Sequence, residues 1–316
     1  STTGARPIRP PIPGIDLPQV QTCWTLADAR KIIELAKPGA HVVQVGAGFI
    51  GCIIMEALKK RGVNLTVVEL GARMVPRMMT PEAGGMIKAW AEKEGINVVT
   101  NTKVEKIDES GSDLSVVLSN GSSMAADAVI MSAGVQPNVE FLEGTGIDIT
   151  DGIHTNDRME TSVADIYAAG DVVAAPDFFT GKPSFSAIQP NAVDEARSAA
   201  LNMAGRDARM HGVLPINVLD TLGLISTSFG QWEGVEGGES VELSNPERFN
   251  YISLQFKDDV LVGATAIGLT QQVGILRGLI QGRVALGKWK DILKNDPLRI
   301  IEAYLACAQK PGVLNG

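Results

Sequence analysis

Short apolar runs alternate with amphipathic stretches over the first third of the chain. The runs are typical of strands buried on both faces of a sheet. They are His41–Val45, Leu65–Glu69 and Ile96–Thr100. Helical periodicity precedes or follows each run, and these helices are expected at residues 25–37, 46–61 and 81–94. This order predicts a parallel, doubly wound α/β sheet.

An antiparallel insert is expected next. Its three strands are predicted at Val104–Ile107, Leu114–Leu118 and Ser122–Ala125. Asn120-Gly121 supplies a tight hairpin turn between the last two strands, because both residues tolerate the left-handed backbone that such turns need. Asp127–Met131 then returns to the parallel sheet.

The later part of the chain changes in character. We expect a short strand at Asp165–Ala169 and a helix at residues 190–204, whereas the proline-rich residues 5–18 are expected to form an extended connector. From residue 215 a separate α+β domain is predicted. Its strands are expected at 216–220, 223–229, 239–243, 250–256 and 260–268, and its helices at 271–281 and 288–306.

Composition excludes several classes of protein. The 316 residues are 45% hydrophobic and carry a net charge of −8 without any block of Lys and Arg, so no nucleic-acid partner is expected. No apolar run is long enough to cross a bilayer, and the first residues lack the layout of a signal peptide. Cys23, Cys52 and Cys307 lie far apart, which argues against a disulfide framework or a zinc site and fits a reducing cytoplasm.

The strongest chemical signal is the sequence VVQVGAGFIG at Val42–Gly51. It places a GxGxxG motif between a predicted strand and a predicted helix, the context in which the motif binds dinucleotides. Gly46 would form the tight turn, Gly48 would let the backbone approach a pyrophosphate, and Gly51 would let helix and strand pack closely. The alternative is that these glycines only solve a packing problem.

A carboxylate follows at the expected distance. Glu69 ends the second strand, where it could accept hydrogen bonds from both ribose hydroxyls and would repel a 2′-phosphate. The motif therefore favours NAD(H) over NADP(H). Arg73 and Arg77 lie close by and weaken that preference.

The order of motifs resembles the FAD-dependent pyridine nucleotide–disulfide oxidoreductase family, in its branch of NADH oxidases, ferredoxin and rubredoxin reductases and nitrite-reductase flavoproteins. The matching stretches cover almost the whole chain. They are Thr2–Pro13 (TTGARPIRPPIP), Val42–Gly51, Val129–Asn138 (VIMSAGVQPN), Thr161–Asp171 (TSVADIYAAGD) and Gln189–Gly205 (QPNAVDEARSAALNMAG).

The resemblance implies a glutathione-reductase-like fold in three domains. A partial FAD-binding domain would comprise residues 1–36 and 140–214, a NAD-binding domain residues 37–139, and a C-terminal α+β interface domain residues 215–316. The interface domain implies a homodimer.

The resemblance also implies residue roles. Asp171, after Gly170, would accept hydrogen bonds from the ribityl chain of FAD, although an Asp after Gly is commonly just a turn former. The expected cofactor-binding residues are Gly4, Arg6, Gly46, Gly48, Phe49, Ile50, Gly51, Glu69, Arg73, Gly134, Val135, Gly170, Asp171, Gln189 and Asn191. No catalytic residue is expected, because hydride passes directly from nicotinamide to flavin.

The chain departs from the family pattern in two places. Nothing before Gly46 corresponds to the first GxGxxG unit of the family, which holds the FAD pyrophosphate, so FAD binding by residues 1–316 alone is expected to be weak or absent. Ile53 stands where many relatives carry Glu, with Glu56 as the nearest acid.

Other chemistry-bearing residues have simpler interpretations. Cys52 is expected to pack against its surroundings, and no metal site is expected. Met74, Met78, Met79 and Met86 are expected to line a helix seam rather than a soft-metal or docking surface. Trp232 and Trp289 are expected in the core, with an electron-transfer partner as the alternative.

The sequence therefore predicts an FAD-dependent NAD(P)H oxidoreductase. It would pass hydride from NADH to flavin and electrons to a small molecule or to a protein such as rubredoxin or ferredoxin. The alternative is a flavin-free, dinucleotide-binding subunit with a structural or regulatory role. The electron acceptor stays open, because the same scaffold serves many acceptors.

Overall fold

The computed structural model describes residues 1–308, apart from the side chain of Thr270. The chain forms two compact units. The larger unit begins at Arg9, runs to Gly134 and resumes at Ile216, and the smaller unit comprises Ser1–Ile8 and Val135–Pro215.

The larger unit contains a five-stranded sheet in the order β2-β9-β3-β4-β5. Every neighbouring pair in it is parallel. Its strands are β2 (Val20–Thr22), β9 (Ala128–Met131), β3 (His41–Val45), β4 (Asn64–Val68) and β5 (Asn97–Val99). Side chains alternate across the sheet, so that Val42 and Val67 enter one core while Val43 and Val68 enter another.

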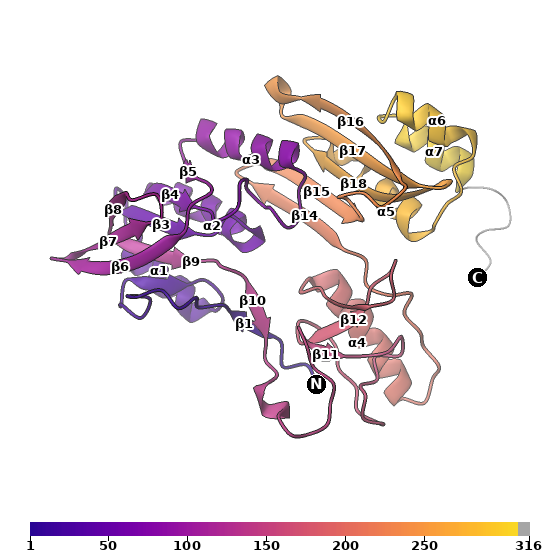
Figure 1. The fold of residues 1–316 in the computed structure, drawn as a ribbon, viewed down its shortest axis with the longest axis horizontal. Coiled ribbons are helices and arrows are strands. Elements are labelled where there is room, and N and C mark those ends of the chain that lie inside the picture. The colour runs from indigo at the N-terminus through magenta and orange to yellow at the C-terminus, as the bar shows by residue number, and fades with distance from the viewer. Residues whose placement is uncertain (309–316) are drawn as a thin grey trace. The chain divides into compact units, whose positions relative to one another are not determined.

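The two faces of this sheet are covered differently (Figure 1). One face packs against α1 (Leu26–Leu35), α2 (Phe49–Lys60) and α3 (Pro81–Lys93). The other packs against a three-stranded antiparallel sheet, which consists of β6 (Val104–Ser110), β7 (Asp113–Leu118) and β8 (Ser123–Ala126). The predicted α/β fold with an antiparallel insert is therefore confirmed, and Gly121 turns the β7–β8 hairpin at a φ of 83°.

A second five-stranded sheet completes the larger unit, in the order β14-β15-β18-β17-β16. Its strands are β14 (Ile216–Thr221), β15 (Leu224–Gly230), β18 (Val260–Ile267), β17 (Asn250–Lys257) and β16 (Glu239–Asn245). One face joins the core that contains α2 and α3, through Leu219 and Tyr251. The sheet is followed by α5 (Val273–Gln281), α6 (Lys288–Asn295) and α7 (Ile300–Cys307).

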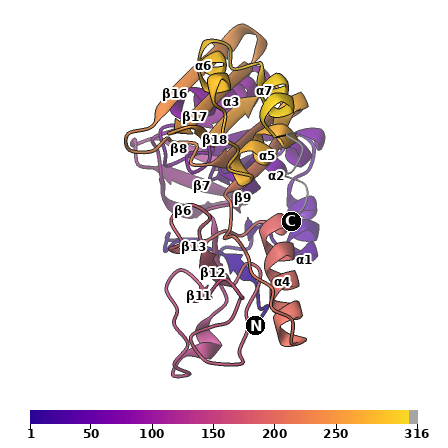
Figure 2. The same ribbon diagram turned by 90° about the vertical axis from the view of Figure 1, so that its right-hand side faces the viewer.

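The smaller unit has little sheet and one long helix (Figure 2). β1 (Ala5–Pro7) pairs antiparallel with β10 (Val135–Pro137). A second small sheet has the order β11-β12-β13. Its strands are β11 (Ile153–His154), β12 (Val173–Pro176) and β13 (Pro183–Phe185), and α4 follows them at Gln189–Met203. Short 3₁₀ turns lie at Glu140–Leu142 in this unit and at Pro246–Arg248 and Thr270–Gln272 in the larger one.

One face of α4 is polar and buried. Asn191, Glu195, Ser198 and Asn202 recur at helical spacing and are all less than a tenth exposed. Each side chain bonds to the backbone of another segment, which lets one helix organise a unit that is poor in sheet.

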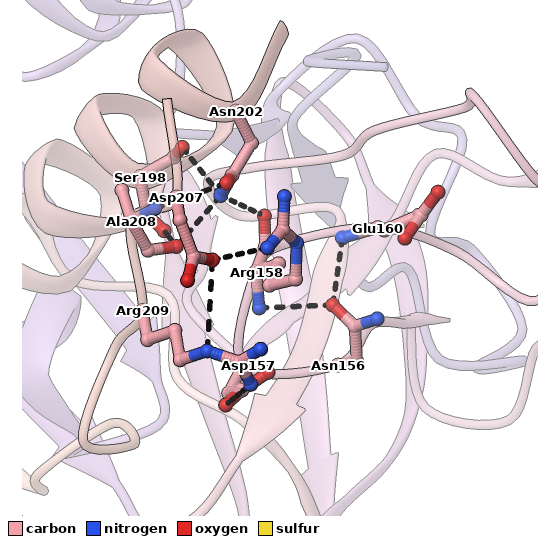
Figure 3. Close-up of polar contacts among 9 residues, drawn as sticks. All are labelled: Asn156, Asp157, Arg158, Glu160, Ser198, Asn202, Asp207, Ala208 and Arg209. Atoms are coloured by element: carbon pink, nitrogen blue, oxygen red, sulfur yellow. Dashed lines mark hydrogen bonds and ion pairs between the residues drawn. The ribbon is translucent and has the colours of Figure 1, made fainter. Parts of the chain in front are cut away.

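The C-terminal end of this face holds two loops together (Figure 3). The amide of Asn202 donates to the carbonyl oxygens of Arg158, at 2.9 Å, and Ala208, at 2.7 Å. Its Oδ1 accepts from the Ala208 N–H at 3.1 Å. Ion pairs of Asp207 with Arg158 and Arg209 join the same loops at the surface, where such pairs add little stability.

Two predicted elements are wrong. Asp165–Ala169 is not a strand: Asp165 has a φ of 63°, and the segment that follows is bonded piecemeal, Ala168 to Met159 and Ala169 to Ser1. The helix predicted at 288–306 is two helices, because Pro297 lies between α6 and α7 and has no N–H to continue the first of them.

The N-terminal boundary also differs from the sequence-based division. Residues 1–36 were expected in one domain, but only Ser1–Ile8 belong to the smaller unit. Val20–Thr22 pairs with β9 and so extends the sheet that carries the glycine motif. Within the proline-rich connector, Ala5–Pro7 forms β1. No helix among residues 1–308 is both long and apolar enough to span a membrane.

Replacing Asn202 with Ala should destabilise the smaller unit by about 2–4 kcal/mol, because it leaves several buried backbone groups unpaired. Unfolding in urea, monitored by hydrogen exchange of peptides from residues 135–215, measures this loss of stability. Met203→Ala is the control, since Met203 is the adjacent residue and is 63% exposed, and it should change stability by less than about 0.5 kcal/mol. Equal effects of the two substitutions would contradict the role of Asn202.

Candidate functional site

The glycine loop, Gly46–Gly51, comprises the turn from β3 and the first residues of α2, at the carboxyl edge of the parallel sheet. Gly46 has a φ of 102°, and a Cβ atom there would lie 2.4 Å from the carbonyl oxygen of Ser132. A Cβ on Gly51 would lie 2.4 Å from the carbonyl oxygen of Gly46. These two glycines are therefore required by the protein's own packing.

Gly48 is different. Its φ is −79°, which any residue can adopt, and no described atom beyond its two chain neighbours lies within 4 Å of where its Cβ would be. It directly precedes α2, whose first N–H groups have no partner within the helix. Packing alone does not explain a glycine here, whereas the close approach of an anionic ligand does.

Glu69 holds the loop in place. Its side chain is 7% exposed, and its two oxygens accept hydrogen bonds from the N–H groups of Ala47 and Gly71, each at 2.7 Å. A carboxylate can accept about four hydrogen bonds, so both oxygens keep capacity for ribose hydroxyls. The structure thus gives Glu69 a loop-fixing role beside the predicted cofactor contact.

A second contact that fixes the glycine loop was not predicted from the sequence. Val75 lies in the loop between β4 and α3, and its N–H donates to the carbonyl oxygen of Ala47 at 2.9 Å. Its φ of 49° is strained for a β-branched residue, which costs about 1–3 kcal/mol. No local sequence motif predicts the role of Val75, because that role arises from a contact with the glycine loop.

Arg73 belongs to the same loop and bonds within it. Its guanidinium donates to the carbonyl oxygens of Met79, at 2.9 Å, and Pro76, at 3.0 Å. Its predicted cofactor contact stays a prediction, and the structure shows an arginine that shapes the loop. Arg77 is exposed.

The first residues of α2 are partly buried. Phe49 and Ile50 pack against the core, while Ile53 is 51% exposed on the outer side of the helix. Glu56, the nearest acid, pairs with Lys60. Gly134, with a φ of 107°, and Val135 lie where the chain passes from the larger to the smaller unit.

In the smaller unit, Gly4 and Arg6 are fixed by the segment around Asn138. The carbonyl oxygen of Gly4 accepts from the Asn138 N–H at 2.9 Å, and Arg6 donates to Asn138 Oδ1 at 2.8 Å. Arg6 also pairs with Glu140, and the carboxylate raises the pKa of the guanidinium. A Cβ on Gly4 would meet no described atom within 4 Å, so its φ of 68° is what favours glycine here.

Asp171 lies in a tight turn before β12. Gly170, with a φ of 84°, accepts from the Val173 N–H at 2.9 Å. The Asp171 side chain has no hydrogen-bond partner among the described residues, and partial burial raises its pKa. A half-buried carboxylate without a protein donor fits the binding of a ligand hydroxyl.

Glu195 is a second acid at this turn that the sequence did not reveal. It accepts a hydrogen bond from the Gly170 N–H at 2.7 Å. Its pKa is raised to about 7, chiefly by burial and in part by the neighbouring carboxylates of Asp171 and Asp194, against the opposing effect of the Gly170 bond. The helical recurrence of polar residues from Asn191 to Asn202 was the available signal.

The start of α4 only partly matches its predicted role. Asn191 is buried, and its amide donates to Ser186 Oγ at 2.9 Å and to the carbonyl oxygen of Leu214 at 3.3 Å. Gln189 is exposed in the first turn of the helix. Their predicted contacts with flavin stay predictions, and Asn191 has a demonstrable structural role.

The sulfur-containing side chains of Cys52 and of the four methionines expected along a helix seam pack in or against the core, but only Met86 of the four lies in a helix. Cys52 is fully buried, and burial raises its pKa to about 12, so it is an unreactive packing residue. Met74, Met79 and Met86 are buried in the core of the larger unit, and Met78 packs against it. Residues 1–308 contain no group of three or more potential metal-binding side chains.

Comparison with known proteins agrees with this geometry. Residues 2–200 match the family described as pyridine nucleotide-disulphide oxidoreductase. Residues 215–284 match the rubredoxin NAD+ reductase C-terminal domain. The two matches include residues of both compact units.

Individual relatives extend the match. The chain is 30% identical over 301 residues to the NADH-dependent phenylglyoxylate dehydrogenase subunit epsilon of Aromatoleum evansii, covering 94% of this chain and 71% of that one. It is 37% identical over 215 residues to an NADH oxidase of Methanocaldococcus jannaschii, covering 67% of this chain and 48% of the oxidase.

A solved structure shares the fold. The NAD-dependent persulfide reductase from A. fulgidus has a TM-score of 0.83 at 30% identity, covering 91% of this chain and 57% of the reductase. The chain therefore spans only about half of the M. jannaschii oxidase and of this reductase.

Replacing Gly48 with Ala should leave folding intact and weaken NADH binding by roughly 10- to 100-fold, because the new methyl group occupies ligand space. Fluorescence titration with NADH and thermal unfolding together measure this. Gly85→Ala is the control: Gly85 lies inside α3, also with no described atom within 4 Å, and alanine there should add about 0.5–1 kcal/mol of stability without affecting NADH. Unchanged NADH affinity in Gly48→Ala would contradict the site.

The raised pKa of Glu195 predicts a pH-dependent stability. A carboxyl whose folded pKa of about 7 exceeds its unfolded value loses stability as pH rises through that range. Glu195→Gln cannot ionise, so relative to the unsubstituted chain it should gain on the order of 2–3 kcal/mol at pH 8 and almost nothing at pH 4. Hydrogen exchange of peptides from residues 135–215 in urea at both pH values measures the difference, and a gain independent of pH would refute the shifted titration.

Proposed function

Since the chain belongs to the pyridine nucleotide-disulphide oxidoreductase family, we propose that it is the NADH-binding part, and a portion of the flavin-binding part, of an FAD-dependent NAD(P)H oxidoreductase. The family's cofactors are NAD(H) and FAD, as the sequence predicted. The observation that carries the proposal is Gly48, a glycine at a helix start that faces space free of described protein atoms.

The larger unit would hold the nicotinamide dinucleotide. The N–H groups at the start of α2 would face the pyrophosphate, whose negative charge the helix dipole would favour. Glu69 would accept the ribose hydroxyls while it keeps Ala47 and Gly71 in place. Its negative charge would disfavour a 2′-phosphate, and Arg73 already donates to loop carbonyls, so we propose NADH as the preferred donor.

The smaller unit would hold the ribityl end of FAD. The Asp171 carboxylate, half-buried and without a described protein donor, fits a sugar-alcohol hydroxyl. When bound, the two cofactors supply the redox chemistry, in which a hydride passes from NADH to FAD. The protein's part would be to bind and orient the cofactors and to exclude water.

The relatives favour an oxidoreductase over the alternative of a flavin-free structural subunit, since they are named as NADH oxidases and NAD-dependent reductases. Those named rubredoxin-NAD(+) reductases support an electron-transfer protein such as rubredoxin or ferredoxin as acceptor. A homodimer formed through the C-terminal domain is part of the proposal. A cytoplasmic location is supported by Cys23, Cys52 and Cys307, which lie far apart in the sequence and form no close pair.

Titrating the chain with NADH and NADPH, while recording flavin absorbance, tests the proposal. We expect saturable NADH binding with weaker NADPH binding. When this chain is joined to a segment that supplies the FAD pyrophosphate site, NADH should also reduce added FAD. Absence of NADH binding in a folded chain would overturn the proposal.

Replacing Glu69 with Ala should lower NADH affinity by roughly 10- to 100-fold and narrow the preference for NADH over NADPH, because the carboxylate both orients Ala47 and discriminates against the 2′-phosphate. Paired titrations with the two nucleotides measure both effects. Glu34→Ala, on the exposed surface of α1, is the charge-matched control and should change neither. If Glu69→Ala lowers the affinity for NADH and for NADPH equally, Glu69 fixes the loop but does not discriminate between the two nucleotides.

A further inference from the structure

The smaller unit contains a buried acid that the proposed reaction does not yet use. Glu195 is 3% exposed, and its Oε2 accepts from the Gly170 N–H at 2.7 Å. Gly170 directly precedes Asp171, so the Glu195 carboxyl holds the backbone next to the carboxylate that would receive the ribityl hydroxyls.

The turn that presents Asp171 is fixed on both sides. After Asp171, the Val172 carbonyl oxygen accepts from the Ile153 N–H at 2.8 Å, and β12 pairs with β11. Before Asp171, Glu195 supplies the only side-chain hydrogen bond to Gly170 within residues 1–308. The left-handed φ of Gly170 leaves this side without regular secondary structure to hold it.

We propose that Glu195 is a positioning residue for Asp171, which fixes the Gly170–Asp171 backbone so that the Asp171 carboxylate accepts ligand hydroxyls. The identity of that ligand, the ribityl chain of FAD, rests on the proposed function. The hydrogen bond itself does not.

The charges around Glu195 agree with this role. The charged groups that act on it in the described part of the chain are Asp171 and Asp194, both acidic. Two nearby carboxyls resist carrying two negative charges and titrate as a pair. With its pKa raised to about 7, Glu195 is about half protonated at neutral pH, and the proton it holds removes a negative charge beside the Asp171 carboxylate.

Amide hydrogen exchange at Gly170 in the full chain tests the positioning. Glu195→Gln keeps a carbonyl acceptor and should leave the Gly170 exchange rate within about threefold, whereas Glu195→Ala should raise it by at least about tenfold. Ser198→Ala is the matched control, because Ser198 lies one turn further on the same face and donates instead to the Ala208 carbonyl oxygen. Equal exchange in Glu195→Ala and the unsubstituted chain, or an equal rise in Ser198→Ala, would overturn the proposal.

Carboxyl ¹³C NMR titration tests the pairing without disturbing Glu195. In Asp171→Asn the titration midpoint of Glu195 should fall by roughly half a unit or more, because a neighbouring negative charge has been removed. An unchanged midpoint would refute the pair. NADH titration of the same samples separates the two proposals. If NADH does not bind but the Gly170 exchange rates and the Glu195 midpoint change as expected, only the proposed function is wrong. If NADH binds but those two measurements do not change, only the role of Glu195 is wrong.

Discussion

The close approach of backbone to backbone at the glycine loop is the constraint on which the larger unit depends. Gly46 lies so near Ser132 that any side chain would collide, and Gly51 lies equally near Gly46. The peptide of Ala47 is then held from two directions, its N–H by Glu69 and its carbonyl by Val75. Gly48 follows this fixed residue at the start of α2, where a Cβ atom would have no described atom within 4 Å beyond its chain neighbours.

The two units use different physical means to fix a ligand group. The larger unit relies on a parallel sheet whose strand ends are held by ladder hydrogen bonds and by apolar cores on both faces. The smaller unit has short strands and relies on the polar face of α4, where Asn202 binds two loops and Glu195 binds the Asp171 turn. This arrangement buries the Glu195 carboxyl, whose ionisation is therefore disfavoured and whose pKa is raised to about 7.

The sequence predicted what local patterns encode. The glycine motif, Glu69 and most strands follow from spacing and alternation, since these report directly on turns, helix starts and burial. Val75 and Glu195 escaped prediction because their roles arise from contacts with residues 28 and 25 positions away. Arg73 was assigned to the cofactor site because it follows Glu69, and Asn191 by resemblance, whereas the structure shows that their side chains bond to the protein itself. The strand expected at Asp165–Ala169 failed because Asp165 adopts a left-handed backbone that apolar patterning does not reveal.

The central claim is that the space beside Gly48 is a dinucleotide site fixed by Glu69. Amide chemical-shift mapping of the chain during titration with NADH tests it most directly. The account predicts that the largest changes fall on the amides of Gly46–Gly51 and of Glu69–Gly71, and that NADPH at the same concentration produces much smaller ones. Changes concentrated elsewhere in the chain, with these amides unmoved at saturating NADH, would contradict it.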